Sequence, residues 1–170
     1  MKQHAAQPTW YLVANAAKCH IFERPDARSP ATLVWEEEEP RGRMHARDLE
    51  TDQAGVIGDK YGDGVRHMDT GQQVKQRLES DRARTLVERL EKARSQGTFR
   101  RLVLIAEPGI LGLLRDKLSH ETRNLLAKSI GKNIAEKPTN AITPELDALD
   151  GVEHVNQPKR LRPRSQQETP

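Results

Sequence analysis

The first third of the chain has the apolar pattern of β-strands. Residues 9–17 contain an almost unbroken apolar run, WYLVA, as expected of a strand that is buried on both faces. Residues 18–24 and 32–38 alternate more between apolar and polar positions, and a proline-containing turn separates them. This region therefore predicts three strands that are joined as a meander.

Helical periodicity replaces this pattern in the second half. Apolar residues at i, i+3, i+4, i+7 and i+10 predict a long amphipathic helix over residues 73–96: Ala83, Leu86, Val87, Leu90 and Ala93. Gly97 provides a left-handed stop for this helix. Residues 101–106 form a second continuous apolar run, which predicts another buried strand, and Pro108 suits the first turn of the helix that follows.

The pattern toward the C-terminus predicts shorter elements. Ser119 is a suitable N-cap for a short helix that continues through Ala127. A last strand is expected over residues 130–136, and a helical turn over residues 144–149.

The predicted order βββαβαβ indicates an α/β fold, with a mixed sheet of about five strands flanked by helices. A long helix between two buried strands normally makes a parallel crossover, and the arrangement is that of a ribonuclease H-like fold. We expect a single domain over residues 9–149, an N-terminal extension over residues 1–8, and a disordered basic tail over residues 150–170.

Residues 40–71 interrupt this domain with a long loop. Large aliphatic residues are scarce there, and the segment is rich in glycine: Gly42, Gly55, Gly58, Gly62, Gly64 and Gly71. The loop exceeds the roughly 12–15 residues usual for a connection without secondary structure, and such long loops are usually functional or disordered. We therefore expect the function to lie in this segment.

Composition limits the class of protein. The 170 residues suit one domain, and 28 Lys and Arg against 25 Asp and Glu give a net charge of +3, which permits an RNA partner without requiring one. The single cysteine, Cys19, cannot form an internal disulfide; we expect a structural thiol in a reducing compartment. We find neither a secretory signal nor a membrane span, so a cytoplasmic protein without membrane insertion is expected.

Motifs for common enzyme chemistry are absent from the sequence. The strands lack the clustered carboxylates that a metal-dependent nuclease needs, and the six histidines lack the pairing of a zinc site. Neither a phosphate-binding GxxxxGK[ST] loop nor a GxSxG nucleophile turn occurs. We therefore expect no metal and no cofactor.

The charged loop provides the best candidates for a binding site. Its cations suit phosphate groups, as arginine side chains do in RNA-binding proteins, and the candidates are Arg41, Arg43, His45, Arg47, Arg66 and His67. Lys75 and Arg77 follow at the entrance of the long helix. Acidic residues in the loop nearly balance these cations, so a solvated loop, or one folded against its own domain, is the alternative.

Three segments resemble the bacterial host attachment protein family: TWYLVANAAKCHIFE, RGRMHARDLETDQAGVIGD and RRLVLIAEPGILGLLRDKLS. The resemblance covers about residues 9–148, and the ILGLLRDKLS stretch is its most specific part. It implies a role in attachment to host cells, and a domain similar to the middle domain of archaeo-eukaryotic peptide-chain release factors.

The release-factor comparison directs attention to the end of the loop. Those factors have a Gly-Gly-Gln motif before a long helix, and here Gly71 and Gln72 match, whereas Thr70 replaces the first glycine. Threonine seldom adopts the positive φ that glycine allows. The departure disfavours catalysis and leaves Gln72, with Gly71, as the one catalytic candidate.

Three functional hypotheses follow. The first is a non-enzymatic intracellular binding module related to translation, which contacts RNA or the ribosome through the loop. The second is an interaction factor that binds another protein in support of attachment or envelope functions. The third is a peptidyl-tRNA hydrolase-like activity that uses Gln72. An exposed edge strand in the meander would also allow a homo-oligomer.

Overall fold

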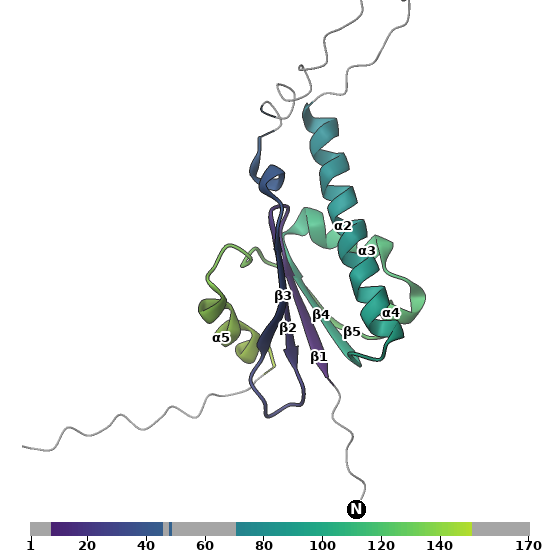
Figure 1. The fold of residues 1–170 in the computed structure, drawn as a ribbon, viewed down its shortest axis with the longest axis vertical. Helices are drawn as coiled ribbons and strands as arrows, with labels where there is room; N and C mark the ends of the chain where they lie inside the picture. The colour runs from purple at the N-terminus through teal and green to yellow at the C-terminus, as the bar shows by residue number, and fades with distance from the viewer. Residues whose placement is uncertain (1–7, 46–47, 49–70, 151–170) are drawn as a thin grey trace, which may run out of the picture.

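The computed structural model describes residues 8–45, 48 and 71–150 (Figure 1). The strands are β1 (Thr9–Ala14), β2 (Lys18–Arg24), β3 (Thr32–Glu38), β4 (Arg101–Ala106) and β5 (Leu126–Gly131). The helices are the short 3-10 helix η1 (Pro40–Arg43), α2 (Gly71–Ser95), α3 (Pro108–Lys117), α4 (His120–Asn124) and α5 (Thr139–Leu149). Most of the expected loop and the basic tail lie outside the described residues, so the proposed domain limits stay a prediction.

The five strands form one mixed sheet in the order β3-β2-β1-β4-β5. Strand β1 pairs antiparallel with β2 and parallel with β4, and β5 is parallel to β4. Strands β1 and β4, which are the two continuous apolar runs of the sequence, lie next to each other inside the sheet. Such strands are apolar throughout because helices cover both of their faces. The predicted α/β fold with a mixed sheet is confirmed, and the more specific ribonuclease H-like assignment stays a prediction.

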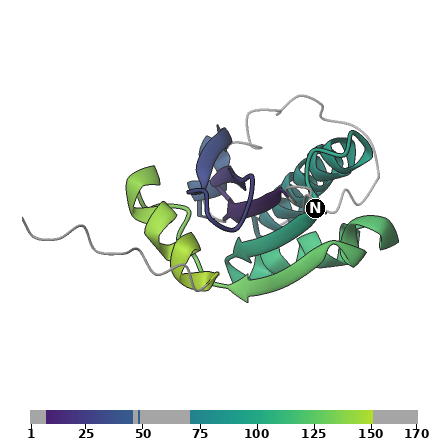
Figure 2. The ribbon, with the colours of Figure 1, turned by 90° about the horizontal axis from the view of Figure 1, so that it is seen from below.

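Helices cover both faces of the sheet and divide the core into two clusters. Helices α2, α3 and α4 lie on one face and α5 lies on the other (Figures 1 and 2). Leu12 and Leu104 point toward α2 and α3, whereas Tyr11 and Val103, their neighbours along the strands, point toward α5. This alternation follows from the two-residue repeat of a strand.

Helix α2 is longer than the sheet is tall. Its first turns extend beyond the carboxyl ends of β1 and β4, next to η1 (Figure 1). Its second half presents the predicted apolar positions to the core, and Gly97 follows it with a φ of 71°, the left-handed conformation expected of a helix stop. The predicted bounds were correct to within two residues at each end.

The structure corrects the predicted elements around residue 125. The helix expected to reach Ala127 ends at Asn124, and the last strand is Leu126–Gly131, not residues 130–136. The strand starts early because the Leu102 amide donates to the Leu125 carbonyl, which begins the parallel pairing with β4. The helical turn expected at residues 144–149 is part of a longer helix, α5.

Cys19 is a structural thiol, as the sequence predicts. It is fully buried in the cluster beneath α2, and burial raises the pKa of its thiol to about 12. A thiol with this pKa contains almost no thiolate at neutral pH, so Cys19 is a poor nucleophile. His20, the next residue, points to the opposite face of the sheet, where its ring lies near that of Phe22.

A buried ionic network attaches α5 to the sheet. Arg24 of β2 pairs with Asp147 of α5, and both side chains are only 2% exposed. Asp150 accepts a hydrogen bond from the Tyr11 hydroxyl and lies 3.3 Å from the guanidinium of Arg101. Burial and the nearby Asp150 carboxylate raise the pKa of Tyr11, so its hydroxyl stays protonated and continues to donate this bond.

None of the described helices is both long enough and apolar enough to span a bilayer.

Candidate functional site

Helix η1 is fixed at the carboxyl ends of the central strands. The Glu39 side chain accepts a hydrogen bond from the Arg41 amide, and the Glu39 amide donates to the Ala17 carbonyl at 2.6 Å. Gly42 packs directly on the backbone of the turn after β1: a Cβ at this position would lie 2.7 Å from the Ala17 Cα and closer still to the Ala16 carbonyl. Only glycine permits so close an approach.

A polar cluster binds the ends of the strands together beneath η1. Asn15 is 5% exposed and donates to Asn133 at 3.2 Å and to Glu136 at 2.9 Å. Its side-chain oxygen accepts the amides of Ala17 and Lys18. Because all the hydrogen-bonding positions of Asn15 face the protein itself, this cluster is part of the framework of the site.

Glu136 links this cluster to η1. Its carboxylate lies 3.4 Å from the Lys18 ammonium and 3.4 Å from the Arg43 guanidinium. The hydrogen bond from Asn15, with the charges of Lys18 and Arg43, lowers the pKa of Glu136 below its usual value. Arg43 also pairs with Glu38 at 2.8 Å, so two carboxylates hold the guanidinium that the sequence suggested for RNA.

Replacing Glu136 with Gln should make the free energy of unfolding depend less on pH in the acidic range. A carboxyl group with a lowered folded-state pKa stabilises the protein above its unfolded pKa, and this contribution disappears as pH falls through the folded pKa. Glu136 is half exposed, so we expect a difference of only about 0.5 kcal/mol at pH 7. Urea unfolding of both proteins at pH 7 and pH 3 measures it; an equal difference at both pH values contradicts the prediction.

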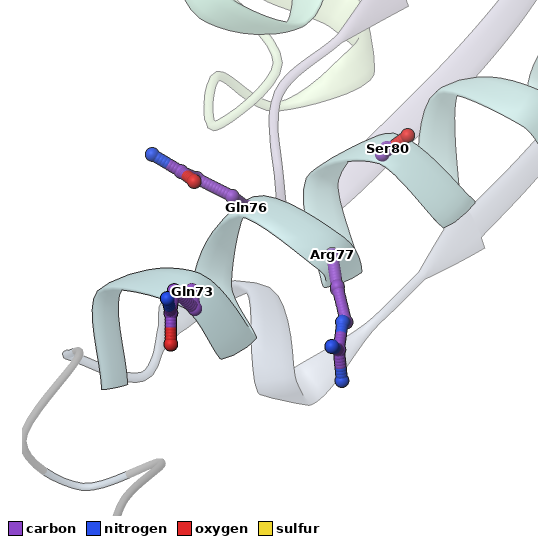
Figure 3. Close-up of a pocket in the computed structure, with 4 residues that line it drawn as sticks. All are labelled: Gln73, Gln76, Arg77 and Ser80. Atoms are coloured by element: carbon purple, nitrogen blue, oxygen red, sulfur yellow. The ribbon is translucent and has the colours of Figure 1, made fainter. Parts of the chain in front are cut away.

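A shallow pocket lies on the first turns of α2, close to the start of the helix. Its volume is about 300 Å³, and it is lined by Gln73, Gln76, Arg77 and Ser80 (Figure 3). These positions are spaced i, i+3, i+4 and i+7, which places them on one stripe of the helix. In Figure 3, Gln73 and Arg77 extend toward the same side, whereas the Gln76 amide points away from them.

The described residues that line this pocket are polar, and none of them is a carboxylate. Two amides, a guanidinium and a hydroxyl offer both donors and acceptors, and the only formal charge among the lining residues is the positive charge of Arg77. Arg41 of η1 lines a separate pocket on this helix, together with Lys75, Leu78 and the two acidic residues Glu39 and Glu79. We call the four pocket residues together with Arg41 the entrance surface.

The structure brings only part of the predicted site together. Arg41 is exposed and makes no side-chain ion pair with a described residue, while His45 is exposed just after η1. Gly71 and Gln72 are the first residues of α2, with Gly71 buried and Gln72 exposed. Arg47, Arg66, His67 and Thr70 lie outside the described residues.

Sequence reasoning missed three of the pocket residues. Arg77 was recognised through its charge, but Gln73, Gln76 and Ser80 are ordinary helix-surface residues in a sequence. Their helical spacing was a usable signal, because it places the four polar residues on one stripe of the helix surface.

Comparison with known proteins identifies a family match. A family model described as "Protein required for attachment to host cells" matches residues 10–146. No curated protein matches the chain. A solved chain called "Archaeal protein" is similar at 12% identity with a TM-score of 0.36; the match covers 85% of this chain and 38% of that one. A likeness this weak supports no argument about fold or function.

Proposed function

Because this chain belongs to the family of proteins required for attachment to host cells, with a match over residues 10–146, we propose that it is a non-enzymatic binding module that acts inside the cell. Its ligand is RNA, free or in the ribosome, and its contact region is the entrance surface with the loop that precedes α2. Effects on attachment are then indirect, through translation.

The observation that supports this proposal is the pocket on the first turns of α2, whose described lining residues are two amides, a guanidinium and a hydroxyl. Amide side chains form paired hydrogen bonds with base edges, and guanidinium groups form them with phosphates. Arg41 and Arg77 supply positive charge on two sides of the same helix end. In the sequence, Arg47, Arg66 and His67 fall between η1 and α2 and are further candidate cations for this contact.

Removal of Arg77 or Arg41 tests the proposal. We expect Arg77→Ala and Arg41→Ala each to weaken binding of purified tRNA or ribosomes. Each should also reduce the slope of log K against log salt concentration by about one, the value for one lost phosphate contact. The matched control is Arg84→Ala, because Arg84 is an exposed arginine of α2 that pairs with Asp81 three residues before it. Titrations at several salt concentrations measure both quantities.

Two results contradict RNA binding. One is the absence of salt-sensitive binding by the unmodified protein. The other is an equal loss of affinity in Arg84→Ala, because a general decrease in charge would then explain the effect without a specific surface.

A protein partner is the second candidate, and the acidic run Glu36 to Glu39 favours it. Glu37 pairs with Arg82 and Glu38 pairs with Arg43, so carboxylates neutralise much of the positive charge near this end of the sheet. Surfaces of mixed charge are typical of protein contacts, in which charge sets orientation. Affinity capture distinguishes the two: recovery of one envelope-regulatory protein without RNA supports this candidate, and ribosomal recovery contradicts it.

A further inference from the structure

A second pocket is lined by residues of β2 and β3. Its volume is about 230 Å³, and it is lined by Lys18, His20, Glu36, Glu37 and Glu38. It shares no lining residue with the entrance surface, and nothing in the proposed RNA contact uses it. Its distinctive member is His20, which is only 8% exposed.

The hydrogen bond of His20 determines which of its ring nitrogens carries a proton. Nε2 lies 3.0 Å from the Ala135 carbonyl oxygen, and because a carbonyl only accepts, Nε2 must be the donor. In the neutral ring, Nδ1 is then a bare acceptor. This nitrogen is buried and has no hydrogen-bond partner.

The surroundings of Nδ1 supply further acceptors. The Glu36 carboxylate lies 3.5 Å from Nδ1, too far for a strong hydrogen bond and on a side chain that is 62% exposed and free to turn. When the ring is neutral, the lone pair of Nδ1 faces those of the Glu36 carboxylate with no hydrogen between them, and they repel. A hydrogen-bond donor is therefore missing between the two side chains. Lys18 does not complete it, because its ammonium lies 3.4 Å from Glu136.

The geometry points to a binding site for an alkylammonium group, either on a small amine or on the lysine side chain of a partner. An ammonium has three N–H donors and no acceptor, which complements the acceptors of His20 and Glu36. Glu37 and Glu38 also line the pocket but already pair with Arg82 and Arg43, so Glu36 is the carboxylate left to pair with an ammonium. No three side chains that could jointly hold a metal ion occur within residues 8–45 and 71–150, which favours ammonium over a metal ion.

Calorimetry with three probes tests the inference on the full chain: 1,5-diaminopentane, a lysine with both backbone ends capped, and uncharged 1-pentanol. We expect at least one amine to bind and pentanol not to bind. Binding of the diamine alone indicates a small amine, whereas equal binding of the capped lysine indicates a lysine on a partner. Failure of both amines overturns the site and leaves the proposed RNA contact unaffected.

Two variants locate the binding. Glu36→Gln removes a charge from an exposed position, and His20→Gln keeps an amide donor for the Ala135 carbonyl while removing the Nδ1 acceptor. Each should weaken amine binding about tenfold or more, as the loss of a charged hydrogen bond does. The charge-matched control Glu88→Gln, on the exposed side of α2, should leave it unchanged.

Nitrogen-15 NMR of the His20 ring gives an independent answer. We expect the Nδ1 resonance to change its shift when the amine is added, while the Nε2 resonance stays that of a protonated nitrogen. A doubly protonated ring in the free protein overturns the inference, because Nδ1 would then already donate toward Glu36. Amine binding that is unchanged in both variants also overturns it.

Discussion

Asp147→Ala is expected to lower the free energy of unfolding by about 3–5 kcal/mol, because it leaves the buried Arg24 without its partner. Both side chains are 2% exposed, so the unpaired guanidinium would stay out of contact with bulk water. The Nε and Nη1 atoms of Arg24 already lack hydrogen bonds, and its remaining carboxylate, Asp150, lies 3.7 Å from Nε. Urea unfolding followed by circular dichroism measures the change.

A control on the same helix separates burial from charge. Glu145 of α5 pairs with Lys132 and Lys137, whose side chains are 58% and 47% exposed, so Glu145→Ala should cost less than about 1 kcal/mol. The double variant Arg24→Met with Asp147→Leu should recover most of the loss, because neither charge is then buried alone. A cost for Asp147→Ala as small as that of Glu145→Ala contradicts the prediction.

This network shows what a single sequence could not reveal. Arg24 and Asp147 are 123 positions apart in the chain, as the Asn15 and Glu136 pair is 121 apart. Hydrophobic periodicity reports which face of an element is buried, but it contains no information on which distant polar residues meet. The two central strands and α2 could be predicted because their signals are local and long.

The one misplaced strand has a related cause. LAKSIG, the sequence of β5, is short, has only two strongly apolar residues and lies at the edge of the sheet. Its pairing with β4 determines its conformation, so tertiary structure overrides weak local preference. Residues 132–136, which the sequence predicted as strand, instead follow β5 as a connection. There Asn133 and Glu136 contact Asn15, and the Ala135 carbonyl contacts His20.

The sequence predicted where the candidate site lies along the chain, but not which of its side chains are available for binding. The charged loop pointed to η1 and the start of α2, and both lie at the same end of the sheet (Figure 1). Charge alone could not distinguish Arg43, which two carboxylates hold, from Arg41, which forms no ion pair with the described residues. That distinction requires the positions of Glu38 and Glu136.

Gly42→Ala is expected to displace η1 from the sheet and to weaken RNA binding with it. The new methyl group would overlap the backbone of Ala16 and Ala17, which cannot move without disturbing the end of β1. We expect a loss of about 1–3 kcal/mol in stability, as for other overpacked sites. Amide exchange of residues 39–44 should also accelerate, since the bond from the Glu39 amide to Ala17 would break.

Gly112→Ala is the matched control, because it adds the same methyl group in α3 where no atom lies within 4 Å. Alanine favours the helix over glycine by up to about 1 kcal/mol, so this variant should be neutral or more stable and should bind RNA normally. If Gly42→Ala matches it in stability and in amide exchange, η1 is not fixed by this contact. If η1 is displaced but RNA binding persists, the loop and α2 suffice for RNA, and Arg41 is not part of the contact.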